Sequence, residues 1–255
     1  MDGVPDELFD AWTAAVEREG ERIGVLTEEL DAGRTPAPGG LETPVPWVPG
    51  WTARDLVVHL GGVHRWTVGI LRAGSTHPPR HGDAHVPDDD LHGWYAQGLI
   101  ELVATLRTTA PGAPAWHMSP AATHTARDWA RRQAHEHTVH RQDLETAASL
   151  PLSPVDPVLA ADGVDEVLAV VLPRWQSDAP LATARARVGV SATDVGRAWT
   201  VEVADGAVRC TDGPVPDADA QVSGTAAQLL LHLWGRPGEV TVDGDRSAEA
   251  LLRGR

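Results

Sequence analysis

The sequence contains no lysine, no asparagine and a single cysteine. Its 21 cationic side chains other than histidine are therefore all arginines, and 36 acidic side chains bring the formal net charge to −15. This charge argues against nucleic acid or an anionic membrane surface as the main partner, because both would repel the protein. The missing lysine and asparagine, beside abundant Ala, Gly, Pro and Arg, indicate a GC-rich genome.

Long apolar runs and a basic leader are missing too. Nowhere does the chain contain the ~18 consecutive apolar residues of a membrane span. The first residues, Met-Asp-Gly-Val-Pro-Asp-Glu, lack the basic start of a signal peptide. We therefore expect a soluble, cytoplasmic protein, whose 255 residues suffice for one large or two modest domains with apolar cores.

Cys210 has no second thiol with which to form a disulfide or a CxxC motif. It lies in the strand-like run Ala207-Val-Arg-Cys-Thr, directly after an Asp-Gly turn. A nucleophilic cysteine needs a neighbour that lowers its pKa, and the local sequence shows none. We expect a structural role for Cys210, so a thiol that does chemistry here must come from outside the chain.

The segment from Arg131 to Asp143 has the pattern of half a metal site on a helix. Glu136 and His140 are four residues apart, so a helix presents both on one face. A carboxylate oxygen and an imidazole nitrogen on adjacent turns are ordinary zinc ligands. Arg132 and Asp143 lie about one turn to either side, where we expect them to support the ligands without binding the ion.

A third ligand must come from elsewhere, and His59 is the candidate. Thr52, with Asp55 three residues later, predicts the start of a helix with a capping box. At helical spacing His59 then shares an apolar stripe with Leu56, Val63 and Trp66. A buried imidazole needs a partner, so His59 is either a satisfied core histidine or a ligand. His64, one position off this stripe, is expected to be solvated.

Together these two motifs resemble the mycothiol-dependent maleylpyruvate isomerase family. The resemblance rests on Pro-Gly-Trp-Thr-x-x-Asp-Leu-x-x-His at 49–59 and His-Glu-x-x-x-His-Arg-x-Asp at 135–143. It continues at Leu159–Leu168 and Leu231–Arg236, so that it covers nearly the whole chain. It implies a DinB-like four-helix bundle that holds one divalent metal, usually zinc, followed by a small α/β, sterol-carrier-like domain.

The resemblance also implies a ligand set and a cosubstrate. His59, Glu136 and His140 match the family's three metal ligands, and a fourth position is left for mycothiol, an actinobacterial thiol that agrees with the GC-rich composition. Arg236 matches a cation that would hold a substrate carboxylate or enolate, for which a guanidinium is well suited. Alternatively, Arg236 is only a cation that interacts favourably with the dipole at the C-terminal end of a helix.

The remaining patterns predict two domains, residues 1–150 and 151–255, joined by the proline-rich linker 151–157. Helices are expected in the first domain at 6–31, 52–72, 91–108 and from 123 or 125 to 148. In the second domain Asp205-Gly206 predicts a hairpin between two strands. Its expected helices are at 158–172 and 225–234, with a short one at the end of the chain, and its strands at 182–190, 200–204, 207–211 and 239–242.

His77, His81 and His85 also repeat every four residues, but prolines and a glycine between them exclude a regular helix. A solvated loop or pocket rim is therefore expected there, in preference to a metal site.

The predicted function is that of a metal-dependent enzyme that uses mycothiol for cis–trans isomerisation or thiol transfer on a small, electrophilic, anionic substrate. His137 and Gln142 depart from the family's usual pattern, so the substrate is left open, as is the oligomeric state. The alternative is a non-catalytic, metal-containing protein that binds a ligand or regulates another protein.

Overall fold

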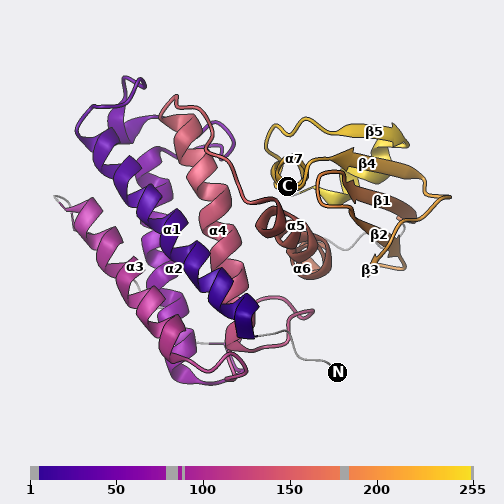
Figure 1. Ribbon diagram of the computed structural model, residues 1–255, viewed down its shortest axis with the longest axis horizontal. Helices are drawn as coiled ribbons and strands as arrows, with labels where there is room; N and C mark the ends of the chain where they lie inside the picture. The colour runs from indigo at the N-terminus through magenta and orange to yellow at the C-terminus, as the bar shows by residue number, and fades with distance from the viewer. Residues whose placement is uncertain (1–5, 79–85, 88–89, 179–183, 254–255) are drawn as a thin grey trace. The chain divides into compact units, whose positions relative to one another are not determined.

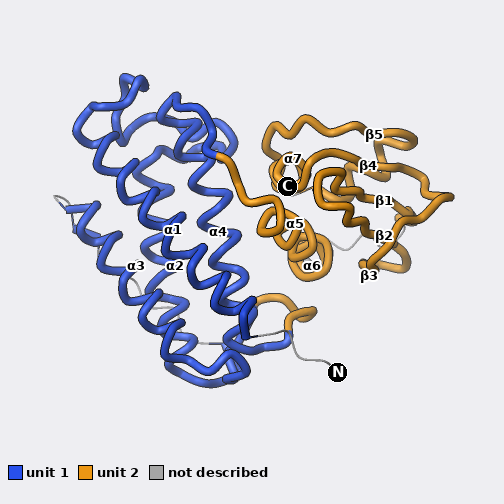
Figure 2. Tube along the Cα trace, in the orientation of Figure 1, with its two compact units in different colours: residues 1–117, 123–153 blue, residues 118–122, 154–255 orange. Residues whose placement is uncertain are grey.

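The computed structural model describes residues 6–78, 86–87, 90–178 and 184–253. The chain forms two compact units, shown in Figure 2. The helical unit comprises residues 1–117 and 123–153, and the sheet unit comprises residues 118–122 and 154–255. The expected domains, 1–150 and 151–255, differ from these units in two respects: the boundary lies three residues later, and residues 118–122 belong to the sheet unit. Ser119 explains the second difference, because its hydroxyl donates to the Val170 carbonyl of the sheet unit at 2.6 Å.

The described part of the helical unit is built on four long helices (Figure 1), which confirms the helical first domain. Helix α1 packs against α3 and α4, while α2 packs mainly against α3 and has far fewer contacts with α4. The bounds are α1 (Asp6–Asp31), α2 (Ala53–Ala73), α3 (Leu91–Thr108) and α4 (Ala126–Ala147), with a short 3₁₀ turn, η1 (Gly40–Glu42), between α1 and α2.

Local caps explain where α2 and α4 begin. The expected capping box of α2 is present: Asp55 N–H donates to Thr52 Oγ1 at 3.2 Å, and Thr52 N–H donates to Asp55 Oδ2 at 2.8 Å. Thr125 and Asp128 form the same reciprocal arrangement at the start of α4. Each box satisfies backbone donors that a helix start leaves without partners.

The buried face of α2 differs from the expected one. His64 is fully buried, so the expectation that it would be solvated was wrong. It shares the inward face with Leu60 and Thr67, whereas His59 is only part-buried. The face of α2 that carries His59 and the face that carries His64 are close together on the helix. The other helices that pack against α2 decide which face is buried, so the α2 sequence alone does not.

A buried ionic network joins α1, α4 and the end of the helical unit. Arg141 donates to Glu19 at 2.5 Å and to Glu145 at 2.6 Å. Glu145 also accepts bonds from the Ser153 hydroxyl at 2.6 Å and the Ser153 N–H at 2.9 Å. Because the Glu145 side chain is entirely buried, these partners replace the hydrogen bonds that its carboxylate would form with water.

The sheet unit holds a mixed five-stranded sheet with the order β3-β2-β1-β4-β5. Strand β1 pairs antiparallel with β2 and parallel with β4, and both outer pairs are antiparallel. The strands are β1 (Ala186–Ala192), β2 (Arg197–Ala204), β3 (Ala207–Asp212), β4 (Ala220–Gly224) and β5 (Thr241–Gly244). Its helical elements are α5 (Pro157–Glu166), the π-turn η2 (Val167–Val171), α6 (Leu172–Asp178), α7 (Ala226–Leu233), α8 (Arg246–Glu249) and the 3₁₀ turn η3 (Ala250–Leu252).

The strand expected at 182–190 is found at Ala186–Ala192, and residues 182–183 of that expectation lie outside the described residues. The strand expected at 239–242 is found at Thr241–Gly244.

Two further details of the sheet unit differ from expectation. The helix expected at 158–172 continues to Asp178, although Pro173 would normally break it. The π-turn η2 immediately before Pro173 shifts the hydrogen bonding, as the Leu172 N–H bonds the Val167 carbonyl. Strand β4 was not predicted, whereas the hairpin at Asp205-Gly206 is confirmed, with φ of 53° and 74°.

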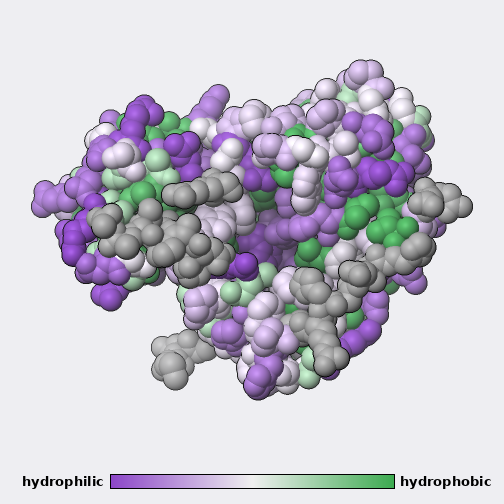
Figure 3. Space-filling view, turned by 180° about the vertical axis from the view of Figure 1, so that it is seen from behind, coloured by the Kyte–Doolittle hydropathy of each residue, from purple (hydrophilic) through white to green (hydrophobic). Residues whose placement is uncertain are grey.

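Few large apolar side chains are exposed among the described residues. In Figure 3, apolar residues on the face drawn lie scattered between polar ones. Within the same residues, no helix combines the length and apolar character needed to cross a bilayer. The large apolar side chains that are exposed come from separate places in the chain: Leu8, Val25, Trp47, Ile100, Leu152 and Val158.

Removal of the Glu145 carboxylate should destabilise the helical unit strongly. In Glu145→Ala the buried Arg141 guanidinium loses a charged partner, so the free energy of unfolding should fall by ~3–5 kcal/mol in urea titrations. The matched control is Glu101→Ala, which breaks an exposed ion pair with Arg72 and should cost at most ~1 kcal/mol. Equal losses in both variants would contradict the importance of the buried network.

Candidate metal centre

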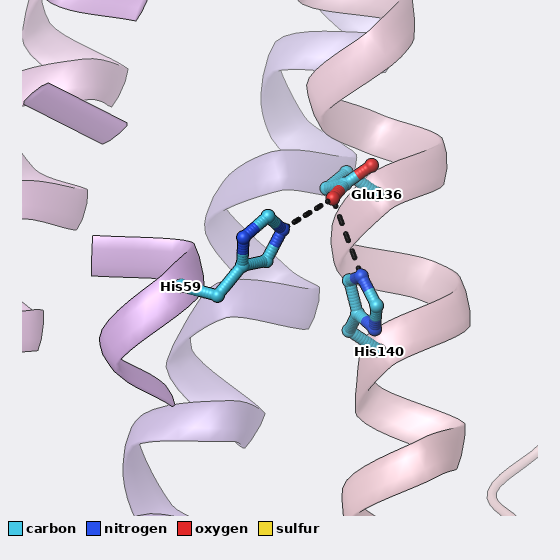
Figure 4. A group of neighbouring side chains, drawn as sticks. All are labelled: His59, Glu136 and His140. Carbon is cyan, nitrogen blue, oxygen red and sulfur yellow. Dashed lines mark hydrogen bonds and ion pairs between the residues drawn. The ribbon is translucent and has the colours of Figure 1, made fainter. Parts of the chain in front are cut away.

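Three side chains from two helices converge in the helical unit, as Figure 4 shows. His59 comes from α2, and Glu136 and His140 come from adjacent turns of α4. Glu136 Oε1 lies 3.1 Å from His59 Nε2 and 3.2 Å from His140 Nε2. The two imidazole rings meet edge to face, with their centroids 5.6 Å apart.

The donor atoms fit one divalent ion. One ligand atom from each of the three residues can be chosen so that all lie within 4.8 Å of one another, the one such group of His, Cys, Asp and Glu among the described residues. Two ligands that are each ~2.1 Å from a tetrahedral ion are roughly 3.4 Å apart. The two observed distances from Glu136 Oε1 are close to this value, and two imidazoles with a carboxylate form an ordinary zinc ligand set.

Two further charged residues orient the three ligands. Arg132 Nη2 donates to Glu136 Oε2 at 2.9 Å, which leaves Oε1 to face the histidines. Asp143 Oδ2 lies 3.0 Å from His140 Nδ1, so Nε2 is the nitrogen directed at Glu136. Asp143 and Arg132 thus contact ligands from behind, in the positions expected of supporting residues.

These contacts also determine the charges of the ligand side chains. Burial opposes ionisation of Glu136, but the Arg132 guanidinium and the hydrogen bonds with His140 and His59 outweigh burial and hold the pKa of Glu136 well below its usual range. Burial likewise opposes a charge on His140, yet hydrogen bonds with Asp143 and Glu136 raise its pKa to about 9. The site therefore holds a carboxylate against an imidazolium, whose charge a bound cation would replace.

The centre is open on the side of His59. The His59 side chain is 34% exposed, compared with 17% for Glu136 and 13% for His140. Trp51, just before α2, packs at the edge of this opening, with its ring 5.0 Å from the His59 ring. Partial exposure of the ligands is what an ion with a free position for a small molecule requires.

Comparison with known proteins agrees with this arrangement. Residues 23–145 match the family model of the mycothiol maleylpyruvate isomerase N-terminal domain, and residues 158–250 match that of the corresponding C-terminal domain. The chain belongs to the mycothiol-dependent maleylpyruvate isomerase family.

Solved structures agree with the family at the level of the fold. The match to the crystal structure of the mycothiol-dependent maleylpyruvate isomerase covers 94% of this chain and 93% of that one. The TM-score is 0.62, and the two sequences are 13% identical. A mutant of that enzyme is 12% identical, with the same score and coverage. Comparison with curated proteins gives no match.

Arg236, the other residue that the family resemblance suggested, belongs to the sheet unit. It follows α7, where Gly235 adopts a φ of 74° and Arg236 N–H bonds the Leu231 carbonyl at 2.8 Å. Its Nη1 donates to the Trp234 carbonyl at 2.5 Å. Arg236 thus contacts the end of a helix, as its alternative interpretation required, and its part in the chemistry is a proposal.

Two buried groups near the centre were not predicted as a pair. His64 Nε2 lies 2.8 Å from His137 Nε2, and their rings are nearly parallel, with an interplanar angle of 4° and centroids 5.0 Å apart. The one available signal was the unusual histidine at position 137, beside the ligand Glu136. Of the histidine loop, His77 is exposed, whereas His81 and His85 lie outside the described residues.

Cys210 is a poor nucleophile, which agrees with its expected structural role. Burial and the nearby carboxylates of Asp165 and Asp212 raise its pKa to about 12. Because a thiol with a raised pKa remains protonated at neutral pH, we expect Cys210 in the native protein to react with iodoacetamide at pH 8 at least ~10-fold more slowly than in 8 M urea. Equal rates in the two conditions would show that Cys210 is reactive in the fold.

Proposed function

We propose that this protein is a metal-dependent enzyme that uses mycothiol to isomerise a cis double bond in a small, electrophilic, anionic substrate. The observation that supports it best is the convergence of His59, Glu136 and His140 around one point, open on one side. Membership of the mycothiol-dependent maleylpyruvate isomerase family supports mycothiol as the cosubstrate and isomerisation as the reaction.

In this proposal the three ligands hold a divalent ion, most simply Zn²⁺. When bound, such an ion lowers the pKa of a thiol at its free position, so that the thiol is available as a thiolate at neutral pH. Arg132 keeps Glu136 ionised and turns its Oε1 toward the histidines. Asp143 holds the His140 ring so that Nε2 remains available to the ion.

The reaction itself requires no net consumption of thiol. The mycothiol sulfur adds to one carbon of the conjugated double bond, and the electron pair moves to the carbonyl oxygen to form an enolate. The former double bond is now single and rotates. Return of the electron pair then expels the sulfur and leaves the trans double bond, so all atoms and electrons balance.

Negative charge builds up on a substrate that is already anionic, so a cation is required at its far end. We assign this task to Arg236, because a guanidinium pairs with a carboxylate or an enolate through two parallel hydrogen bonds.

The thiol balance tests the proposed reaction directly. With limiting mycothiol and an excess of a cis-configured, conjugated keto acid such as maleylpyruvate, an isomerase produces many equivalents of trans product per thiol. A thiol transferase instead stops after one equivalent, with a conjugate detectable by mass spectrometry. A metal-loaded protein that changes neither thiol nor substrate would contradict an enzymatic function and favour a binding or regulatory protein.

The ligand assignment is tested by metal content. Purified protein should contain one divalent ion per chain, and His59→Ala and His140→Ala should lose it, because two ligands are left in each variant. Asp143→Asn should weaken metal affinity by ~10–100-fold without abolishing binding, since only the support of His140 is removed. The control is His77→Ala, an exposed histidine outside the site, which should retain the ion. Complete loss in Asp143→Asn would show that Asp143 is itself a ligand.

Substitution of Arg236 should affect turnover and spare metal binding. Arg236→Ala should lower kcat by ~10²-fold or more, because a preorganised cation is removed from the developing charge. Arg236→Lys retains the charge without the planar fork, so it should keep part of the activity. Both variants are measured at saturating thiol with the metal content checked. Near-normal turnover of Arg236→Ala would show that Arg236 has no part in catalysis and only contacts the end of α7.

A further inference from the structure

The ligands of the proposed metal centre come from two helices that pack together only weakly. Helix α2 supplies His59 and packs mainly against α3, while α4 supplies Glu136 and His140 and packs mainly against α1. A metal site tolerates displacements of only a few tenths of an ångström between ligands. Something must therefore hold α2 and α4 in register beside the site.

Three side-chain contacts run along the line where these helices meet. His59 contacts Glu136, His64 contacts His137, and Trp66 contacts Trp129 with ring centroids 5.2 Å apart. From His59 to Trp66 along α2, the partner on α4 changes from Glu136 to Trp129, which is the order of two antiparallel helices. The His64–His137 contact comes directly after the ligand pair, since His137 is the neighbour of Glu136 and His64 is little more than one turn beyond His59.

The hydrogen-bonding pattern assigns a direction to this contact. His137 Nδ1 lies 2.7 Å from the Gln133 carbonyl, which can only accept, so a neutral His137 offers Nε2 as the acceptor. His64 then donates from its own Nε2 across 2.8 Å, which leaves its buried Nδ1 without a hydrogen-bond partner among the described residues.

The layer around His64 and His137 contains more buried polar groups than the stability of the fold requires. Both rings are fully buried, and so are the side chains of Gln133 and Thr67. The polar side-chain atoms of Gln133 and Thr67 have no hydrogen-bond partner among the described residues. An apolar layer of the same volume would stabilise the fold at least as well. Buried polar pairs are best attested where they specify the register of packed helices, since a directional bond forms in one alignment only.

We propose that the His64–His137 pair fixes the register of α2 against α4 and so brings His59 to the ion held by Glu136 and His140. Both are positioning residues: they act through the ligands and touch neither the ion nor the substrate. This proposal rests on the proposed metal site.

The test compares stability with metal affinity in His64→Leu, His137→Leu and the double variant. Each single change leaves one buried nitrogen without a partner and should lower Tm, whereas the double change removes both nitrogens and should recover Tm. The affinity for Zn²⁺, measured by competition with a chromophoric chelator, should be ~10-fold or more weaker in all three. The visible spectrum of the Co²⁺-loaded double variant should also differ from that of the unaltered protein, because the ligand geometry changes.

Two further variants control the experiment. His64→Gln retains an N–H donor near the position of Nε2, so it should keep much of the affinity that His64→Leu loses. Tyr95→Phe keeps the ring that contacts His64 and removes only the hydroxyl, which donates to the Gly20 carbonyl at 3.2 Å between helices that carry no ligand. It should lower Tm and leave the affinity for Zn²⁺ unchanged.

A double variant that binds Zn²⁺ as tightly as the unaltered protein would overturn the proposal. So would equal losses of affinity in Tyr95→Phe, because general loosening would then explain the effect. If the double variant does not fold, the comparison of His64→Gln with His64→Leu decides, and equal affinities there would also refute the proposal. Failure of the metal site itself is distinguishable, because the unaltered protein would then bind no Zn²⁺.

Discussion

The carboxylate of Glu136 is the contact on which the proposed centre depends. One of its oxygens meets His59 and His140 at 3.1 and 3.2 Å, and the other meets Arg132 at 2.9 Å. A buried carboxylate is unfavourable unless cations and hydrogen-bond donors surround it. The contacts that keep Glu136 ionised therefore also position both imidazoles, so charge compensation and ligand geometry have the same origin.

The helical unit uses its buried polar groups in two ways. Around Glu145 and Arg141 the hydrogen bonds are short and numerous, and they connect α1, α4 and Ser153. Between α2 and α4 the groups are less completely satisfied, as the side chain of Gln133 shows. Functional sites often contain groups that lower the stability of the fold. Here the unsatisfied polar groups lie between α2 and α4, the two helices that carry the proposed ligands.

Local patterns predicted much of this structure. Thr52 with Asp55 marked the start of α2, and the four-residue spacing of Glu136 and His140 placed both on one face. The choice of His59 as third ligand, however, needed the resemblance to a family. The apolar spacing around His59 predicted only that its side chain points inward, and in the structure that side chain is part-exposed. His64 was misplaced because its partner His137 is 73 residues away. Strand β4 was missed for a similar reason, since its five residues become a strand through parallel pairing with β1.

If His59, Glu136 and His140 hold an ion with a free position for the thiol, X-ray absorption at the metal edge should reveal both the ligands and the thiol. Spectra are recorded on the purified protein with and without mycothiol. We expect nitrogen and oxygen neighbours with the scattering signature of two imidazoles, and one sulfur neighbour that appears only when mycothiol is added. A spectrum without imidazole, or one in which mycothiol never adds sulfur, would show that the ligands or the free position are wrongly assigned.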